Sequence, residues 1–213
     1  MKLRLKRLNG LYLITDHQHQ HDKKLFQDVE TALSAGVQIL QYRDKSGNRQ
    51  KQLHQCRQLR ELTAEYDCVF IINDDPELAL SCDADGVHLG KTDGAYEHAR
   101  KLLGPEKIIG SSCYNQLERA LHFQQIGADY VAFGRFFPSK TKPDAIQAEP
   151  ALLSNARQQL QIPIVAIGGI SHDNAQPLLD AGADMLAVIN GVFGQADIRQ
   201  ATVKFQNLLT SEG

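Results

Sequence analysis

The sequence predicts an α/β protein, a single (β/α)8 TIM barrel that spans residues 1–213, and three observations support this fold class. Strand-like and helix-like segments alternate eight times, with no break in composition between them. The strand-like segments are short, almost continuous apolar runs, which is typical of a parallel sheet buried on both faces. Three joins between a helix and the next strand repeat one pattern around a glycine. Eight such units fit a compact barrel, whereas the alternative, a doubly wound open sheet, normally has fewer strands or a longer chain.

The first four strands are indicated by apolar runs, and each run precedes a segment with helical periodicity. In the first helix, Leu25, Val29 and Leu33 recur on one face. Pro76 stands at a first-turn position that proline tolerates, which marks the start of the third helix. The expected strands are 11–15, 37–42, 69–72 and 87–89, and the helices that follow them are 24–35, 50–66, 76–82 and 96–103.

The second half of the chain repeats this order. Asn115 is a candidate cap for the helix that runs to Ile126. Gly36, Gly127 and Gly182 supply left-handed helix stops directly before the next strand. The remaining expected strands are 107–110, 130–133, 163–167 and 185–189, and the helices after the last three are 151–160, 172–181 and 195–209.

Composition excludes several classes of partner and location. A formal net charge of −2 provides no field for binding nucleic acid or a membrane surface. The first ten residues are basic, but no apolar stretch of seven residues follows, so we expect a short N-terminal leading segment rather than a secretory signal or a membrane span. Four cysteines without C-x-x-C spacing favour free thiols in the reducing cytoplasm. The oligomeric state stays open, a homo-oligomer included.

Two acidic clusters follow the third and fourth predicted strands. Asn73, Asp74 and Asp75 end one apolar run, and Asp93 closes the segment after the other. If these strands are parallel neighbours, the carboxylates meet at one edge and repel each other unless a cation lies between them. Mg²⁺ commonly takes one or two carboxylates together with substrate phosphate oxygens. The alternative is a pair of ordinary solvated turns, in which Asp and Asn are common.

A cationic group follows the second predicted strand. Gln41, Arg43 and Lys45 alternate, so that they point the same way while the chain stays extended, and Tyr42 and Asp44 point the other way. Arginine binds phosphate through two parallel hydrogen bonds, and lysine adds a point charge. The pattern therefore indicates an anion site near the carboxylates, with a solvated loop as the alternative.

A second anion site is indicated after the sixth, seventh and eighth strands. Gly134 begins a loop that carries two hydroxyls and an ammonium group. The pair Gly168-Gly169 is expected to open a helix, and backbone N–H groups at such a position bind anions. Two anion sites in one pocket suggest that two phosphorylated molecules are joined with loss of diphosphate. The further candidate residues of this site are Ser139, Thr141, Lys142, Ile189 and Asn190.

The motifs resemble the thiamine phosphate synthase family over nearly the whole chain. They are L-Y-L-I-T-D, Q-Y-R-D-K, I-N-D-D, D-G-V-H-L-G-K-T-D, the segment from G-A-D-Y through S-K-T-K-P-D, and P-I-V-A-I-G-G-I. The resemblance implies a transferase that condenses 4-amino-2-methyl-5-hydroxymethylpyrimidine diphosphate with 4-methyl-5-hydroxyethylthiazole phosphate to give thiamine phosphate and pyrophosphate. The chemistry suggests a dissociative substitution assisted by Mg²⁺, without a general base.

The resemblance also assigns roles by position. It implies that Asp74 and Asp93 hold Mg²⁺ and that Gln41 binds the pyrimidine. Diphosphate binding is implied for Arg43, Lys45, Asn73 and Lys142, with Ser112 close by, and Arg43, Lys45, Lys142 and Ser112 are the candidate catalytic residues. The thiazole phosphate is implied to lie against Ser139, Thr141, Gly169 and Ile189. The chain departs from the family pattern at Lys91, Tyr114, Arg135 and Ser139, which puts substrate details in doubt rather than the reaction class.

Three other functions remain open at this point. The cluster of His17, His19 and His21 after the first strand would suit a zinc-dependent hydrolase, although no matching histidines follow the fifth and sixth strands. A thiazole tautomerase of the same family would need neither diphosphate nor Mg²⁺. A non-catalytic sensor of thiamine precursors would keep the same barrel. His88 and His122 are expected to be packing or surface residues.

Overall fold

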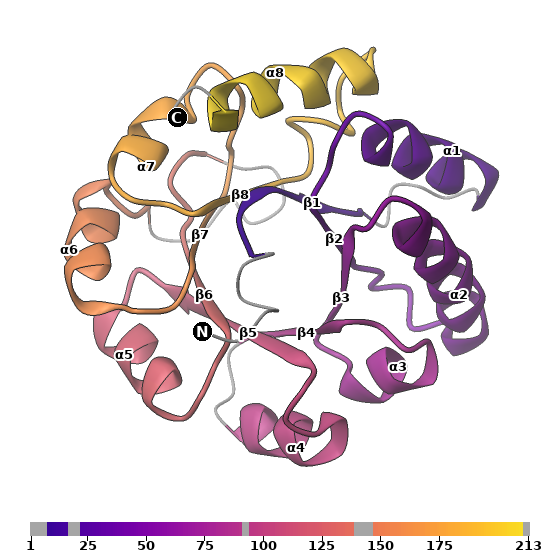
Figure 1. Ribbon diagram of the computed structural model, residues 1–213, viewed down its shortest axis with the longest axis horizontal. Helices are drawn as coiled ribbons and strands as arrows, with labels where there is room; N and C mark the ends of the chain where they lie inside the picture. The colour runs from indigo at the N-terminus through magenta and orange to yellow at the C-terminus, as the bar shows by residue number, and fades with distance from the viewer. Residues whose placement is uncertain (1–7, 17–21, 91–93, 139–146, 211–213) are drawn as a thin grey trace.

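A computed structural model describes residues 8–16, 22–90, 94–138 and 147–210. Eight parallel strands form a closed barrel in sequence order, and the helices surround it (Figure 1). Strand β1 (Gly10–Ile14) pairs both with β2 (Ile39–Tyr42) and with β8 (Met185–Val188), which closes the sheet. The predicted (β/α)8 barrel is therefore confirmed, and the open-sheet alternative is wrong.

Most elements lie within a few residues of their predicted bounds. The other strands are β3 (Val69–Asn73), β4 (Gly86–Leu89), β5 (Ile108–Tyr114), β6 (Tyr130–Phe133) and β7 (Ile164–Ile167). The helices are α1 (Asp22–Leu33), α2 (Arg49–Glu65), α3 (Pro76–Ser81), α4 (Gly94–Leu103), α5 (Leu117–Gln125), α6 (Ala151–Gln159), α7 (Gln176–Asp180) and α8 (Ile198–Thr210). No helix in this described part of the chain is both long and apolar enough to cross a bilayer.

Three local predictions were wrong. Strand β5 extends to Tyr114 instead of ending at residue 110, because pairing with β4 and β6 continues through polar residues that carry no apolar signal. Helix α7 begins at Gln176, not at residue 172, because the Ser171 N–H donates to Asn174 Oδ1 in a turn that precedes it. Asn115 does not cap α5, whose N-cap position belongs to Gln116 and has no side-chain hydrogen bond.

The glycine stops are confirmed. Gly36, Gly127 and Gly182 have φ of +100°, +96° and +100°, and each directly precedes the residues that lead into a strand. A side chain with a Cβ is disfavoured in this region of backbone conformation, which is why the repeated pattern was informative in the sequence.

The strands separate two apolar layers. One lies between sheet and helices and the other fills the barrel, where Leu8 also packs at the amino end. The alternation of side chains along each strand assigns neighbours to opposite layers, as Leu11 and Tyr12 illustrate. The barrel interior contains Tyr12, Ile14, Ile39, Val69, Ile71, Ile108, Tyr130, Ala132, Val165, Met185 and Ala187.

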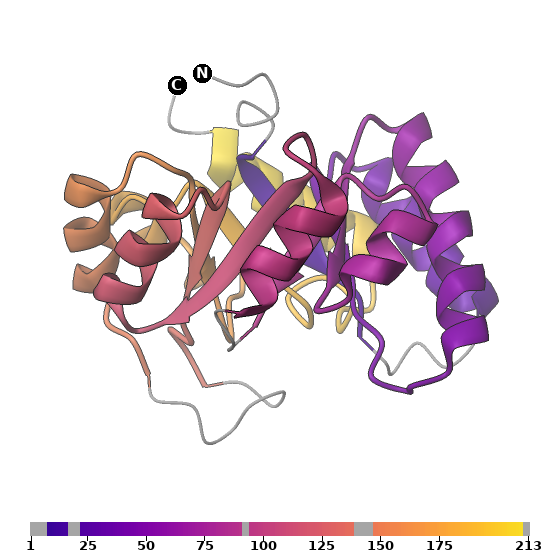
Figure 2. The same ribbon diagram turned by 90° about the horizontal axis from the view of Figure 1, so that it is seen from below.

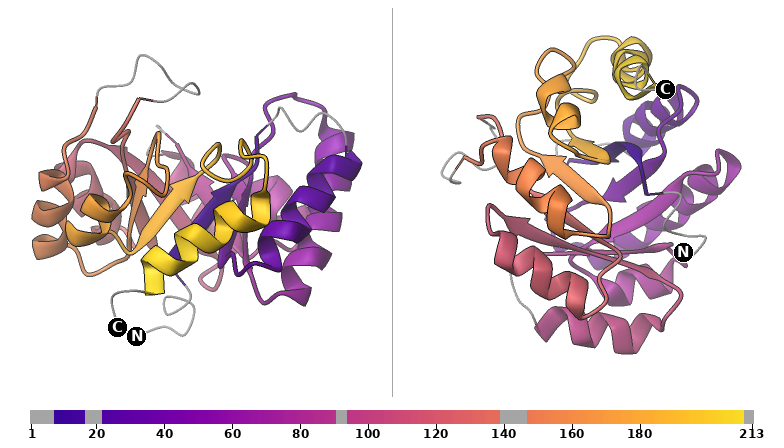
Figure 3. Two further views of the ribbon diagram at one scale, coloured as in Figure 1. Left: turned by 90° about the horizontal axis from the view of Figure 1, so that it is seen from above. Right: turned by 60° about the vertical axis from the view of Figure 1, so that its left-hand side comes forward.

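The loops that follow the strands gather at one end of the barrel. This end is at the bottom of Figure 2 and at the top of the left view in Figure 3. Polar side chains that follow different strands are thereby brought to one rim. In (β/α)8 enzymes this rim carries the active site.

Gly110 makes room for an aromatic ring inside the barrel. A Cβ at this position would lie 1.9 Å from Cζ of Tyr130, so any side chain would displace the tyrosine. We expect Gly110→Ala to lower the free energy of unfolding by about 1–3 kcal/mol or more, the usual cost of overpacking a core. Urea denaturation measures this change.

The matched control is Ser111→Ala in the same strand. Ser111 is fully buried, and its hydroxyl has no hydrogen-bond partner within the described ranges, so its removal should change stability by less than about 1 kcal/mol. Equal stability of wild type and Gly110→Ala would contradict the packing described above.

Candidate active site

The end of β2 is fixed by the end of β1. The Thr15 N–H donates to the Gln41 carbonyl over 2.9 Å, and the Thr15 hydroxyl accepts from the Arg43 N–H over 2.8 Å. These two bonds extend the strand pairing past the last ladder residues. They set where Arg43 leaves the barrel rim.

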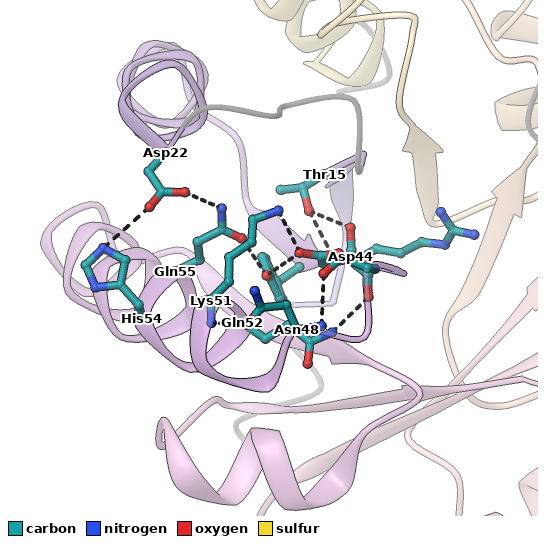
Figure 4. A network of polar contacts seen from close by, with 11 residues as sticks. Thr15, Asp22, Asp44, Asn48, Lys51, Gln52, His54 and Gln55 are labelled. Carbon is teal, nitrogen blue, oxygen red and sulfur yellow. Dashed lines mark hydrogen bonds and ion pairs between the residues drawn. The ribbon is translucent and has the colours of Figure 1, made fainter.

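The outward side of the same loop is held by a polar network (Figure 4). The Tyr42 hydroxyl donates to Gln55 Oε1 over 2.6 Å, and Lys51 Nζ lies 3.1 Å from Asp44 Oδ2. The Ser46 N–H donates to Asp44 Oδ1 over 2.6 Å. This geometry anchors β2 on its outer face, where Tyr42 and Asp44 lie away from Gln41 as predicted. Lys45, which was predicted to lie on the Gln41 side, lines one cavity together with Tyr42 and Asp44.

The Asp44 carboxylate is the centre of that network. Its side chain is only 4% exposed. Burial alone would raise its pKa, but the hydrogen bonds from Ser46 and the nearby Lys51 ammonium outweigh burial, so the pKa lies below its usual range. Asp44 thus remains an anion that holds the segment between Arg43 and Lys45 from behind.

The network continues to two helices. Asn48 caps α2 by accepting from the Lys51 N–H over 3.1 Å. Gln55 Nε2 donates to Asp22 Oδ1 over 2.7 Å, and His54 Nε2 lies 3.7 Å from the other Asp22 oxygen (Figure 4). The first turn of α1 is therefore tied to α2 behind the loop.

The two aspartates that follow β3 have different roles: Asp75 is structural, and Asp74 belongs to the candidate site. Asp75 accepts from the Leu78 N–H over 2.7 Å as the cap of α3 and also pairs with Arg49. Asp74 has φ of +60°, and its N–H donates to the His88 carbonyl over 2.8 Å. This left-handed backbone turns Asp74 out of the strand direction at the rim.

Asp74 meets the cationic group of the second loop. Lys45 Nζ lies 2.7 Å from Asp74 Oδ2, and Asn73 Nδ2 donates to the same oxygen over 2.8 Å. The side chains of Lys45 and Asp74 are 49% and 43% exposed. The structure thus brings three of the predicted site residues into contact.

This contact changes the acidity of Asp74. Burial by itself would raise the pKa of the carboxyl, but the Lys45 ammonium and the Asn73 amide outweigh it and the pKa is lowered. Because the folded pKa is below the unfolded value, the stabilising contribution is present above the unfolded pKa. It is lost as the pH falls through the folded pKa.

A cavity of about 310 Å³ lies between the second and third loops. Its lining includes Lys45, Asn73 and Asp74, and it is therefore continuous with the group described above. The complete lining is Tyr42, Asp44, Lys45, Gln52, Ile72, Asn73, Asp74, Asp75, Glu77 and Leu78.

Gln41 and Ser112 are joined through the barrel interior. Gln41 Nε2 donates to the Tyr12 hydroxyl over 2.8 Å, and the hydroxyls of Tyr12 and Tyr130 lie 2.7 Å apart. Tyr130 lies 3.0 Å from His88 Nδ1, and His88 Nε2 lies 2.9 Å from Ser112 Oγ. Five side chains from five strands thus form one continuous line, which is called the interior chain below.

Sequence reasoning missed the two tyrosines of this chain. Tyr12 and Tyr130 are 1% and 0% exposed. Both occupy inward positions in apolar strands, where tyrosine needs a partner for its hydroxyl. Gly110 within a strand was a further signal, because such a glycine often marks close approach of another group. Of the two histidines expected to be packing or surface residues, His88 is buried and His122 is exposed.

The sixth and seventh loops lie against each other. The Phe136 N–H donates to the Ile167 carbonyl over 3.2 Å, and the Phe137 N–H donates to the Gly168 carbonyl over 3.0 Å. Gly169 has φ of +66°, and a Cβ there would lie 2.4 Å from the Pro138 carbonyl oxygen. The chain leading to residue 139 therefore begins beside Gly169.

The expected helix start at Gly168-Gly169 is wrong, since α7 begins seven residues after Gly169, at Gln176. The two glycines form a turn with φ of +105° and +66° instead. At the neighbouring β8 end, Ile189 packs on the interior cluster, and Asn190 is exposed and accepts from Gln195 Nε2 through its carbonyl over 2.9 Å.

Several predicted residues lie outside the part that the structure describes. They are Asp93, Ser139, Thr141 and Lys142, together with Lys91 and the histidines His17, His19 and His21. Of the departures from the family pattern, Tyr114 ends β5 beyond an irregularity in its pairing with β6. Arg135 accepts from the Ala148 N–H through its carbonyl over 2.7 Å.

A closed parallel barrel with cationic, amide and carboxylate groups on its carboxyl rim defines a (β/α)8 protein whose site is built from βα loops. A family model described as thiamine monophosphate synthase matches residues 11–192, and the chain belongs to this family. The family expected from the sequence motifs is thereby confirmed.

Individual relatives agree with this assignment. The chain is 45% identical over 203 residues to a thiamine-phosphate synthase of Thiobacillus denitrificans, covering 95% of this chain and 96% of that one. It is 48% identical over 193 residues to a thiamine-phosphate synthase of Alcanivorax borkumensis, covering 91% and 89%. Among solved structures, a thiamine phosphate pyrophosphorylase from Pyrococcus furiosus superposes with a TM-score of 0.86 at 38% identity, with 98% of each chain covered.

The ion pair at the rim has a measurable consequence. We expect Lys45→Met to raise the pKa of Asp74, because the ammonium group that favours the carboxylate is removed while burial remains. A titration of the Asp74 side-chain carbon by NMR measures this shift.

Lys51→Met is the control, because Lys51 pairs with Asp44 on the outer face of the loop. It should raise the pKa of Asp44 and leave that of Asp74 unchanged. An unaltered Asp74 titration in Lys45→Met would show that the ion pair does not persist in solution.

Proposed function

We propose that the protein is a transferase that joins 4-amino-2-methyl-5-hydroxymethylpyrimidine diphosphate to 4-methyl-5-hydroxyethylthiazole phosphate, giving thiamine phosphate and pyrophosphate. The observation that carries this proposal is 45–48% identity to proteins named thiamine-phosphate synthase over more than 90% of the chain. The rim group of Lys45, Asn73 and Asp74 supports it independently, since it suits a diphosphate.

The second loop is proposed to bind the diphosphate. Arg43 would supply paired hydrogen bonds and Lys45 a mobile charge, with Asn73 as a neutral donor. Lys45 forms an ion pair with Asp74, so diphosphate binding would transfer its ammonium group from the carboxylate to phosphate oxygens. Lys142 and Ser112 are proposed as further donors.

Asp74 is a suitable ligand for the proposed Mg²⁺. Its carboxylate offers hard oxygen atoms at the rim, and the left-handed backbone presents them away from the strand. Among the described residues, no three His, Cys, Asp or Glu side chains are grouped to hold a metal ion. The ligands proposed beside Asp74 are Asp93, which the resemblance implies, diphosphate oxygens and water. When bound, the cation would neutralise charge on the leaving diphosphate.

The proposed reaction is a dissociative substitution at the methylene carbon of the pyrimidine. The bond from this carbon to the diphosphate oxygen breaks, and the electron-rich aminopyrimidine stabilises the resulting cation. Arg43, Lys45 and Lys142 stabilise the negative charge that develops on the diphosphate. The thiazole nitrogen then forms the new bond to carbon, and its positioning in the pocket provides much of the remaining rate increase.

The thiazole phosphate is proposed to bind at the sixth to eighth loops. Gly169 provides a backbone turn with no side chain, and Ile189 supplies an apolar surface at the neighbouring strand end. Hydrogen bonds from Ser139 and Thr141 would complete the site, with Asn190 beside it. The contact between Gly169 and the segment that leads to residue 139 supports this arrangement.

The tautomerase alternative is less well supported, because it gives no role to the group of Lys45, Asn73 and Asp74. Pyrophosphate release separates the proposed synthase from a sensor, which gives none. The relatives reported above are named for synthesis rather than for tautomerisation. We place the enzyme in the cytoplasm as part of the proposal, because its four cysteines are buried free thiols. Its ligands are proposed to be small phosphorylated molecules.

The proposal is tested by measuring pyrophosphate release. Release should require both substrates and Mg²⁺, and Arg43→Ala should reduce kcat/KM for the diphosphate substrate by about 10²-fold, the usual effect of removing one stabilising donor. Arg57→Ala, which removes an exposed arginine of α2, is the matched control and should retain wild-type kinetics. No pyrophosphate from the wild-type protein with both substrates present would refute the proposed activity.

A further inference from the structure

The interior chain connects two residues that the proposed function places against one substrate. Gln41 lies at one end, at the proposed pyrimidine site, and Ser112 lies at the other, near the proposed diphosphate site. Tyr12, Tyr130 and His88 link them without a gap, at 2.7–3.0 Å per contact. None of these three linking residues has a role in the function proposed so far.

Each of the three linking residues has one proton to donate within the chain when the imidazole is neutral, which gives the chain a direction. The Gln41 amide donates through Nε2 to Tyr12, so the Tyr12 hydroxyl is left to donate to Tyr130. The Tyr130 hydroxyl then donates to His88 Nδ1. A neutral imidazole that accepts at Nδ1 carries its proton on Nε2, and this N–H donates to Ser112 Oγ.

The direction determines what the two ends offer to a ligand. Because Gln41 uses one Nε2–H within the chain, its Oε1 is left to accept a hydrogen bond from a ligand, beside a second Nε2–H that can donate. Because Ser112 accepts from His88, its own O–H is left to donate. In this direction the Gln41 end offers an acceptor and the Ser112 end offers a donor, and burial of both tyrosines keeps water from exchanging these roles.

Reversing one end requires reversing the whole chain. A flipped Gln41 amide would accept from Tyr12, which would then accept from Tyr130. His88 would carry its proton on Nδ1 and accept from Ser112 at Nε2. The Ser112 hydroxyl would then point its lone pairs at the diphosphate, which repels them.

We propose that Tyr12, Tyr130 and His88 are positioning residues that couple diphosphate recognition at Ser112 to selection of an amino group at Gln41. This inference rests on the proposed function. A diphosphate that accepts from Ser112 fixes the chain in the direction that leaves Gln41 as an acceptor. A 4-amino group donates a hydrogen bond to Gln41 Oε1. A 4-oxo group in the same place would bring two acceptor oxygens together, which repel each other. Such coupling is reciprocal, so the amino group also favours diphosphate binding.

The packing around the chain supports a dedicated role. Tyr130 crosses the barrel where Gly110 leaves space for it. Its ring lies edge-on to that of Tyr12, with centroids 5.9 Å apart, and is stacked on that of His88 with centroids 5.6 Å apart. Burial raises the pKa of both tyrosine hydroxyls above the usual value, which keeps them as neutral donors.

The first test is the tautomer of His88 in the wild-type protein. With ¹⁵N-labelled histidine, the ring nitrogens report which atom carries the proton, and His88→Asn identifies the signals. We expect a neutral ring protonated on Nε2, both in the free protein and with Mg²⁺ and pyrophosphate. A proton on Nδ1, or on both nitrogens, would overturn the inference without bearing on whether the protein is a synthase.

The second test compares binding of the 4-amino and 4-oxo forms of hydroxymethylpyrimidine diphosphate by calorimetry, in the absence of thiazole phosphate. We expect the wild type to bind the amino form at least about 10-fold more tightly, and Tyr130→Phe to bring this ratio close to one. Tyr96→Phe is the matched control, because Tyr96 is a buried tyrosine whose hydroxyl has no partner among the described residues.

A general loss of stability cannot produce this pattern, because it would weaken both forms alike. An unchanged ratio in Tyr130→Phe would contradict the coupling even if both affinities fell. If Tyr130→Phe does not fold, the tautomer measurement on the wild type still decides the matter. Failure of the proposed activity is recognised separately, by the absence of pyrophosphate release.

Discussion

The pairing of β1 with β8 is the interaction on which the rest of the structure depends. Four residue pairs, from Gly10 with Met185 to Leu13 with Val188, close the sheet and make it a barrel. Closure places the carboxyl ends of all eight strands on one rim, so that residues far apart in the sequence, such as Lys45 and Asp74, meet there. It also creates the enclosed interior through which Tyr12 reaches Tyr130 across 118 positions of sequence.

Strand β2 shows how both faces of a strand serve one site. On its outer face, Tyr42 is held by helix α2, as is Asp44 in the loop that follows, and these contacts fix the loop that carries Arg43 and Lys45. On its inner face, Gln41 is held by the interior chain. The loop is thus anchored from the outer face and the Gln41 amide from the inner face. Both anchors limit the conformational reorganisation that accompanies ligand binding.

The fold could be predicted because its signals are local. Alternating apolar runs and the glycine stops at Gly36, Gly127 and Gly182 act within a few residues of themselves. The extension of β5 and the late start of α7 were missed because pairing with neighbouring strands and a turn at Ser171 decided them. The candidate site could likewise be predicted only in part. Family motifs indicated Gln41, Lys45 and Asp74. No local pattern shows that Lys45 contacts Asp74 or that buried tyrosines connect Gln41 to Ser112.

The central proposal is that the rim holds two phosphate sites, of which only the one at Asp74 uses a divalent cation. A crystal structure of the protein grown with Mg²⁺ and pyrophosphate tests it most directly. We predict that pyrophosphate lies against Arg43 and Asn73, that the cation bridges it to Asp74, and that Lys45 has left its 2.7 Å contact with Asp74 for a phosphate oxygen. Pyrophosphate bound only beside Gly169, with the ion pair of Lys45 and Asp74 intact, would contradict the account.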